Sequence, residues 1–275
     1  MSARERVGSA VTGLLSVVIG LVWVFPLYWA VNTAFTVDQK TAQIPPSWFP
    51  SPILTDAFTY VIKNTALVRW YLNSVVTSLA ITAAVLMLTV MCGYALSQMK
   101  FRGRQLIFVA ILAGFMVPTA TNVVPLFMFM NKLGMVNTYW GVILPQLAAP
   151  IAVVIYKQFF DQMPAELSDA ARMDGGTDLR ILFRLFLPLN WGVTWALAII
   201  LFIGAWNNFF WPFIIVSQTP MMTIPVGITQ VQSWYGIAYP RQMASAVLAA
   251  LPTAVLFVIF QRQVQQGVAI TSGIK

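Results

Sequence analysis

The chain has 275 residues, of which 59% are hydrophobic and 9% are charged. An ordinary soluble domain has roughly 45–50% apolar and about 25% charged residues, so this composition excludes a water-soluble globular protein. The 16 Lys and Arg residues outnumber the 8 Asp and Glu residues and give a net charge of +8 at pH 7. A basic excess of this kind indicates nucleic-acid binding only where it forms a patch, and no block of like charge is present here.

Long uncharged runs divide the chain into candidate membrane spans. A charged residue at the centre of a spanning helix costs about 2.5 to 3.5 kcal/mol, and about 20 apolar residues cross a bilayer as a helix. The first run follows Arg4, Glu5 and Arg6 and exceeds the roughly 7–15 apolar residues of a signal peptide, so we expect a retained helix. The sequence predicts an all-α polytopic membrane protein with one transmembrane domain over 1–275. Its six spans are expected at 8–32, 71–98, 106–130, 139–160, 188–216 and 242–260.

Basic residues between these spans predict the orientation. With a cytoplasmic N-terminus, eleven of the 16 Lys and Arg residues lie on the cytoplasmic side and five lie outside. Because cytoplasmic loops carry the excess of Lys and Arg, both termini are expected in the cytoplasm.

Several kinds of chemistry lack the residues they need. The chain has no histidine, and its one cysteine, Cys92, has no disulfide partner. No carboxylate lies within the predicted spans, although ion-coupled transport usually requires one. Residues that break helices, such as Pro118 and Pro212, occur inside spans, where they indicate either kinks in a packed bundle or a water-lined pathway.

Charge is concentrated in segment 161–184, which holds eight charged residues, a third of the total. Pro164 and Glu166 suit the first turn of a short helix. Asp174, Gly175 and Gly176 form its stop, and Thr177 caps a second helix. The pattern predicts two short helices joined by a tight turn, which fits a solvated loop as well as a docking element.

This segment resembles the EAA loop of the integral-membrane subunits of bacterial ABC importers. The matching run is Glu166-Leu167-Ser168-Asp169-Ala170-Ala171-Arg172-Met173-Asp174-Gly175-Gly176, followed by Phe183 and Leu187-Pro188. Stretches at 93–96, 100–104, 132–141 and 206–209 resemble carbohydrate-uptake permeases similar to the smaller membrane subunit of the maltose transporter. Asp169 and Gly176 depart from the usual Glu and Ala, and Gly176 would loosen the turn by up to ~1 kcal/mol if that position were helical.

The resemblance implies a type I ABC importer permease fold and a permease subunit that translocates a carbohydrate or related polar solute by alternating access. It also implies a heterodimer with a second homologous permease, two ATPase subunits and an extracytoplasmic solute-binding protein, in the bacterial cytoplasmic (inner) membrane. The chain has no GxxxxGK[ST] phosphate loop. ATP and Mg²⁺ are therefore expected on the ATPase subunits, with no cofactor, metal or catalytic residue on this non-enzymatic chain. A secondary transporter or channel without ATPase partners is the alternative.

The resemblance makes segment 161–187 a cytoplasmic coupling loop whose helix sits in a groove on the ATPase. The residues expected to contact the ATPase or form the turn are Glu166, Leu167, Asp169, Ala170, Ala171, Asp174 and Gly175. Sugars present hydroxyls and apolar ring faces, so a pathway needs neutral polar and aromatic groups. The candidates are Asn122, Trp206, Asn207, Asn208 and Phe209. Helix packing is the competing interpretation for each, and a disaccharide, an oligosaccharide, an amino sugar and a glycerol phosphate all stay open as substrates.

Overall fold

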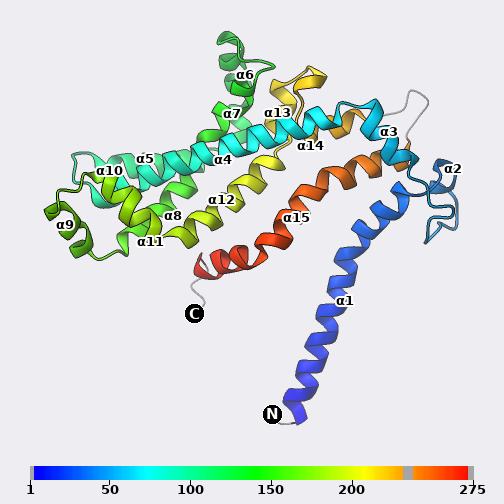
Figure 1. The fold of residues 1–275 in the computed structure, drawn as a ribbon, viewed down its shortest axis with the longest axis horizontal. Coiled ribbons are helices and arrows are strands. Elements are labelled where there is room, and N and C mark those ends of the chain that lie inside the picture. Colours follow the sequence, from blue (N-terminus) through cyan, green and yellow to red (C-terminus); the bar gives the residue numbers. More distant parts are fainter. Residues whose placement is uncertain (1–2, 232–237, 272–275) are drawn as a thin grey trace. The chain divides into compact units, whose positions relative to one another are not determined.

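The computed structural model describes residues 3–231 and 238–271, and its regular elements in these ranges are all helices (Figure 1). Four helices are long and apolar enough to cross a membrane, and two bent helix pairs raise this number to as many as six. Helices satisfy their backbone hydrogen bonds internally, which lipid requires of any spanning segment. The predicted all-α membrane fold is confirmed.

The helices follow one another with short connections. The α-helices are α1 (Ala3–Ala34), α2 (Asp38–Thr41), α3 (Asp56–Asn64), α4 (Leu67–Gln98), α5 (Arg104–Met116), α6 (Val123–Lys132), α7 (Tyr139–Ile143), α8 (Pro150–Asp161), α9 (Ala165–Met173), α10 (Asp178–Ile181), α11 (Leu187–Leu189), α12 (Trp191–Trp206), α13 (Phe210–Ile215), α14 (Ile224–Gly227) and α15 (Tyr239–Thr271). Tighter 3₁₀ turns cover Thr119–Asn122, Leu144–Leu147, Thr219–Met221 and Ile228–Gln230, and a π-helical turn covers Leu182–Phe186.

Contacts along the chain define two compact units, 1–68 with 227–252 and 69–226 with 253–275. The first unit contains α1 to α3 and the beginning of α15. Within it, the amide nitrogen of Asn32 donates to the carbonyl oxygen of Ser47 at 3.1 Å, and the Arg241 guanidinium lies 3.7 Å from the centroid of the Tyr60 ring. That the whole chain forms a single domain in the membrane stays a prediction.

The second unit is built around a buried aromatic cluster formed by Tyr94, Tyr156, Phe160 and Phe186. These side chains are at most 3% exposed, and each ring has at least one neighbour in the cluster with ring centroids 5.2 to 6.3 Å apart. Gly93 permits the close crossing of α4 and α8, because a Cβ atom there would lie 2.7 Å from the Cβ of Tyr156. The cluster therefore joins α4, α8 and the π-helical turn into one packed block.

Two predicted spans, 106–130 and 139–160, are bent pairs rather than straight helices. The first bends by 86° and the second by 46°. Val117 is extended, with ψ of 120°, because the ring of Pro118 disfavours helical backbone in the residue before it. In the predicted span 188–216, α12 ends at Trp206 and α13 begins at Phe210. These breaks leave backbone groups that need partners from elsewhere in the protein.

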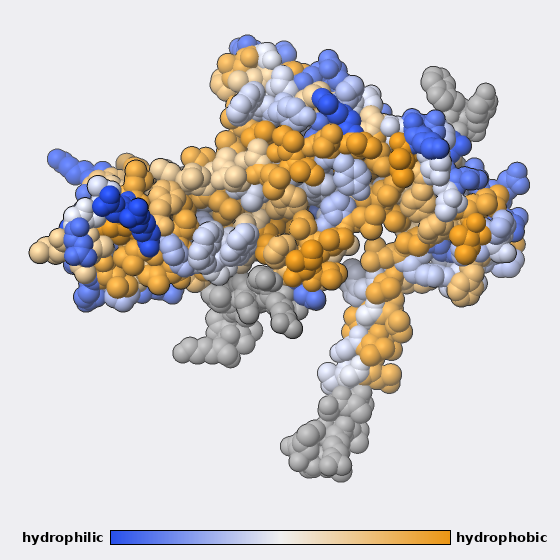
Figure 2. Space-filling view, in the orientation of Figure 1, coloured by the Kyte–Doolittle hydropathy of each residue, from blue (hydrophilic) through white to orange (hydrophobic). Residues whose placement is uncertain are grey.

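Apolar side chains remain exposed on the long helices. Figure 2 shows hydrophobic residues along α4, where Leu72, Val75, Val76 and Leu79 form an exposed stripe at helical spacing. A bilayer or an apolar partner would cover such a surface, in agreement with a membrane protein.

Candidate functional site

Helix α9 ends in a tight turn at the predicted stop. Asp174 is its C-cap, and Gly175 has a φ of +76°, which favours glycine. The N–H of Gly175 donates to the carbonyl oxygen of Arg172 at 3.0 Å, and the N–H of Gly176 donates to that of Ala171 at 2.9 Å. These two bonds define a Schellman motif, which satisfies the last carbonyls of the helix.

Gly176 lies outside both helices, within the predicted stop. The loosening expected of glycine at a helical position does not apply, because residue 176 follows the turn. A Cβ atom at Gly176 would lie 2.6 Å from the carbonyl oxygen of Ala171, so the turn itself requires close approach at this position. Thr177 then caps α10, with its hydroxyl oxygen accepting from the N–H of Arg180 at 3.4 Å.

The side chains of α9 divide into an outward and an inward set. Leu167 is 39% exposed and Met173 is 88% exposed. Ser168 is buried, and Ala171 is half-buried against the aromatic cluster. The predicted residues that lie outward are Glu166, Leu167, Asp169, Ala170, Asp174 and Gly175. Ala171 is thus not part of the same exposed face.

Asp178 connects the loop to α4. Its Oδ1 atom pairs with Nη2 of Arg172 at 3.2 Å and accepts from the hydroxyl of Tyr94 at 3.4 Å. Sequence reasoning missed this role of Asp178. The only local signal was its place directly after the cap Thr177, and that place fits any helix start.

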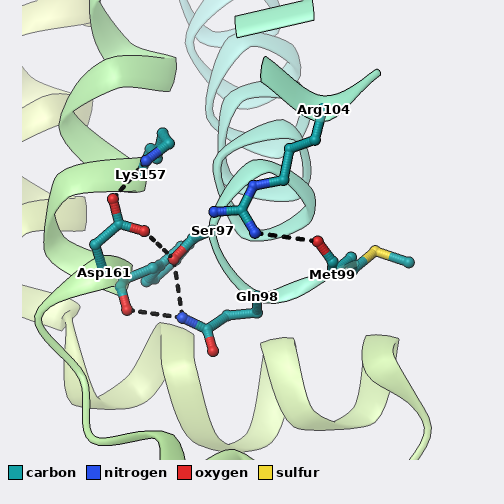
Figure 3. A network of polar contacts seen from close by, with 7 residues as sticks. Ser97, Gln98, Met99, Arg104, Lys157 and Asp161 are labelled. Carbon is teal, nitrogen blue, oxygen red and sulfur yellow. Dashed lines mark hydrogen bonds and ion pairs between the residues drawn. The ribbon is translucent and has the colours of Figure 1, made fainter. Parts of the chain in front are cut away.

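A second polar contact joins the ends of α4 and α8 (Figure 3). The Ser97 hydroxyl donates to Oδ1 of Asp161 at 2.7 Å, and Nζ of Lys157 pairs with Oδ2 of Asp161 at 2.5 Å. The side-chain amide of Gln98 donates to the carbonyl oxygen of Phe160 at 2.9 Å. Asp161 precedes α9 and Asp178 follows it, so α4 contacts the chain on both sides of this helix.

The break between α12 and α13 carries most of the predicted pathway residues. The Asn208 amide donates to Oε1 of Gln146 at 2.5 Å, which links this break to the 3₁₀ turn before α8. Asn207 is exposed, and Phe209 stacks on Phe213 with ring centroids 5.0 Å apart. Gln146 was missed by sequence reasoning, although an amide beside a proline in an apolar run was an available signal.

The remaining two pathway candidates differ from these in burial or in position. Trp206 is 2% exposed and stacks on Phe202 at 5.9 Å, an arrangement that favours helix packing. Asn122 is exposed at the bend between α5 and α6. The structure therefore brings Asn207, Asn208 and Phe209 together at one break and does not bring Asn122 to the same one.

Comparisons with known proteins agree with this architecture. Residues 85–269 match the model of the family described as "Binding-protein-dependent transport system inner membrane component". The arabinooligosaccharides transport system permease protein AraQ of Halalkalibacterium halodurans is 36% identical, over 94% of this chain and 93% of that protein. The lactose transport system permease protein LacG of Rhizobium radiobacter is 31% identical, over 89% of each chain.

A solved structure carries the same fold. A bacterial ABC transporter involved in the import of the acidic polysaccharide alginate superimposes with a TM-score of 0.84 at 20% identity, over 95% of this chain and 98% of that one. The fold and the helical loop thus define a permease of the ABC importer class, as expected. The chain belongs to the family of binding-protein-dependent transport system inner membrane components.

Proposed function

We propose that this chain is the non-catalytic permease subunit of an ATP-driven importer that moves a carbohydrate or related polar solute across the inner membrane by alternating access. The observation that carries the proposal is α9, a short exposed helix with a Schellman end, in the same unit as the long apolar helix α4. Relatives named for arabinooligosaccharides and lactose support the saccharide class. A relative named for sn-glycerol-3-phosphate supports the inclusion of related polar solutes beside saccharides.

The coupling loop 161–187 is the proposed contact with a separate ATPase. Glu166, Leu167 and Met173 are all exposed on this loop, so that acidic and apolar side chains are both available to a partner. The complex would contain a second, homologous permease as heterodimer partner, two ATPase subunits that bind ATP and Mg²⁺, and an extracytoplasmic binding protein. A solved alginate transporter in complex with its periplasmic protein supports the last of these partners in general terms.

The proposed orientation has loop 161–187 and both termini in the cytoplasm. The distribution of basic residues supports this orientation, because eleven of 16 fall on that side. The terminal residues themselves, 1–2 and 272–275, lie outside the described ranges. A transporter without ATPase partners is not favoured, because the family is one of binding-protein-dependent systems.

The break between α12 and α13 is the proposed solute contact on this subunit. Amide groups both donate and accept hydrogen bonds, which suits sugar hydroxyls, and Asn207 and Asn208 stand beside the exposed ring of Phe209. Gln146 joins this set through its bond to Asn208. Asn122 is a weaker candidate because it lies at another bend, and the burial of Trp206 supports packing.

Charge reversal at the coupling helix tests the function. In the assembled complex, Glu166→Lys should lower ATPase co-purification and saccharide uptake together, because it places like charge at the positive end of α9 and changes the docking face. Asp38→Lys is the matched control, since Asp38 is equally an exposed acid in the first turn of a helix, but in the other unit. It should leave ATPase co-purification unchanged. Full association and uptake with Glu166→Lys would contradict the coupling role, and uptake without any ATPase would favour the alternative.

A further inference from the structure

We propose that α4 carries the movement of the coupling loop to segment 219–224, which contacts the other end of the same helix. Tyr94 and Ser97 are then positioning residues at the loop end, and Trp70 and Asn73 are positioning residues at the far end. The inference rests on the proposed function, since it describes how the coupling loop would act on the rest of the permease.

Helix α4 has the properties of a rigid rod. Its 32 residues run without a proline over about 48 Å, at about 1.5 Å per residue. The hydroxyls of Thr77, Thr82 and Thr89 each donate to a carbonyl oxygen four residues earlier, at 2.7 Å, so these buried groups need no outside partner. The pair α5 and α6, in contrast, bends by 86°. A bent pair can absorb a displacement at its break, whereas a continuous helix passes it along.

At the loop end, α4 contacts the chain on both sides of α9. Ser97 bonds to Asp161, four residues before α9 begins, and Tyr94 bonds to Asp178, five residues after it ends. Gly93 brings α4 against α8 closely enough that a Cβ atom would overlap with Tyr156. A displacement of α9 therefore acts on α4 through two separate polar contacts and a packed crossing.

At the far end, α4 supplies the donors that segment 219–224 requires. The indole N–H of Trp70 donates to the carbonyl oxygen of Thr219 at 2.8 Å. The amide of Asn73 donates to the carbonyl oxygens of Pro220 and Met222, each at 2.8 Å. Asn73 is 0% exposed, so losing these bonds would leave buried polar groups unpaired.

Two further bonds complete this attachment. The Tyr139 hydroxyl donates to Oδ1 of Asn73 at 2.7 Å, and the hydroxyl oxygen of Ser74 accepts from the N–H of Ile224 at 2.8 Å. The backbone of segment 219–224 is thus hydrogen-bonded to side chains from one short stretch of α4. It must follow α4 or lose several buried hydrogen bonds.

The test reports on segment 219–224 from the loop end. The complete complex in nanodiscs carries Cys92→Ala, which removes the chain's only cysteine, and Thr219→Cys at an exposed position. The rate of maleimide labelling at residue 219 is compared between the nucleotide-free and the ATP–vanadate-trapped complex. We expect the two rates to differ by about fivefold or more, the low end of typical coupling strengths.

Tyr94→Phe should bring the ratio of these two rates close to one, and should lower uptake per ATP hydrolysed. It deletes a hydroxyl but keeps the ring that packs on Phe160 and Phe186. The matched control is Tyr156→Phe, which deletes a hydroxyl from the same cluster whose partner is Thr194 on α12, at 3.2 Å, rather than the loop. Asp178→Asn provides a second variant that weakens the same contact from the loop side.

The outcomes separate the inference from the function on which it rests. Equal effects of Tyr94→Phe and Tyr156→Phe on the ratio of labelling rates would overturn the role of Tyr94. A general disturbance of the aromatic cluster would then explain both results. If the complex transports but the labelling rate at residue 219 is the same with and without trapped nucleotide, the role of α4 is overturned. The proposed function would then stay intact. A parent complex without uptake and ATP hydrolysis would remove both proposals.

Discussion

Gly175 is the residue on which the geometry of α9, the proposed coupling helix, depends most directly. Its φ of +76° places an L side chain in the left-handed region, at a cost of about 1 to 2 kcal/mol. We expect Gly175→Ala to loosen the end of α9 and to reduce uptake at equal expression, while the isolated binding protein retains its affinity for the solute. Uptake and ligand binding measured side by side check this expectation.

Gly192→Ala is the control for that substitution. Gly192 lies in α12 with an ordinary φ, and a Cβ atom added there would meet no other atom within 4 Å, so alanine fits. Transport should be unchanged in this variant. Equal losses in both variants would show that the conformation of residue 175 is not the cause.

Some features of single residues could be predicted from the sequence, and others could not. The stop at Asp174 and Gly175 was predicted, because a C-cap followed by glycine is a local signal. The bond between Tyr94 and Asp178 joins residues 84 positions apart, and no local pattern specifies such a contact. The close approach of Gly176 to Ala171 likewise depends on the turn's three-dimensional path, which the sequence does not record.

Among the elements, the crossing of α4 and α8 is open to a direct test. Gly93→Val would insert side-chain atoms where even a Cβ would lie 2.7 Å from that of Tyr156. Overpacking of this kind typically costs about 1–3 kcal/mol. The thermal unfolding temperature of the purified complex should therefore fall.

Gly114→Val serves as the comparison for the helix crossing. Gly114 lies within α5, and a Cβ atom there meets nothing within 4 Å. Its effect on the unfolding temperature should be small, since only the modest helix preference of valine changes. Unfolding temperatures that fall equally in both variants would argue against a tight crossing at Gly93.

Helix positions followed from the sequence more readily than helix shapes. Uncharged runs located the apolar stretches, and Pro118 indicated a break in the third. The 86° bend at that break depends on what the neighbouring helices offer the freed backbone groups, which composition does not record. The bond between Asn208 and Gln146 likewise joins two helix breaks that lie far apart in the chain, so no local pattern predicts it.

Topology is the prediction that concerns the whole molecule. In a Cys92→Ala background, Ile44→Cys and Met173→Cys place single thiols at positions 96% and 88% exposed, one in each unit. With both termini cytoplasmic, an impermeant maleimide added to spheroplasts should label residue 44 directly and residue 173 only after permeabilisation. The reverse pattern would overturn the orientation inferred from the positive charges.

The broad class of the molecule was accessible from composition, whereas its function was not. Hydropathy and charge indicated a helical membrane protein, but only the resemblance of segment 166–176 and the further matching stretches pointed to an ABC importer. The family match and the shared fold then agreed with that interpretation. Physical pattern alone left a solvated loop and a docking helix equally open, because both have exposed charges and short helices.

The position of α9 between Asp161 and Asp178 makes it a replaceable module. The contacts that hold the loop to α4 involve residues just outside the helix, so the outward side chains of α9 contribute little to the fold. Only Ser168 and Ala171 face inward and constrain an exchange. Under the coupling role proposed for α9, the docking sequence could therefore change to suit a different ATPase without redesign of the membrane-spanning core.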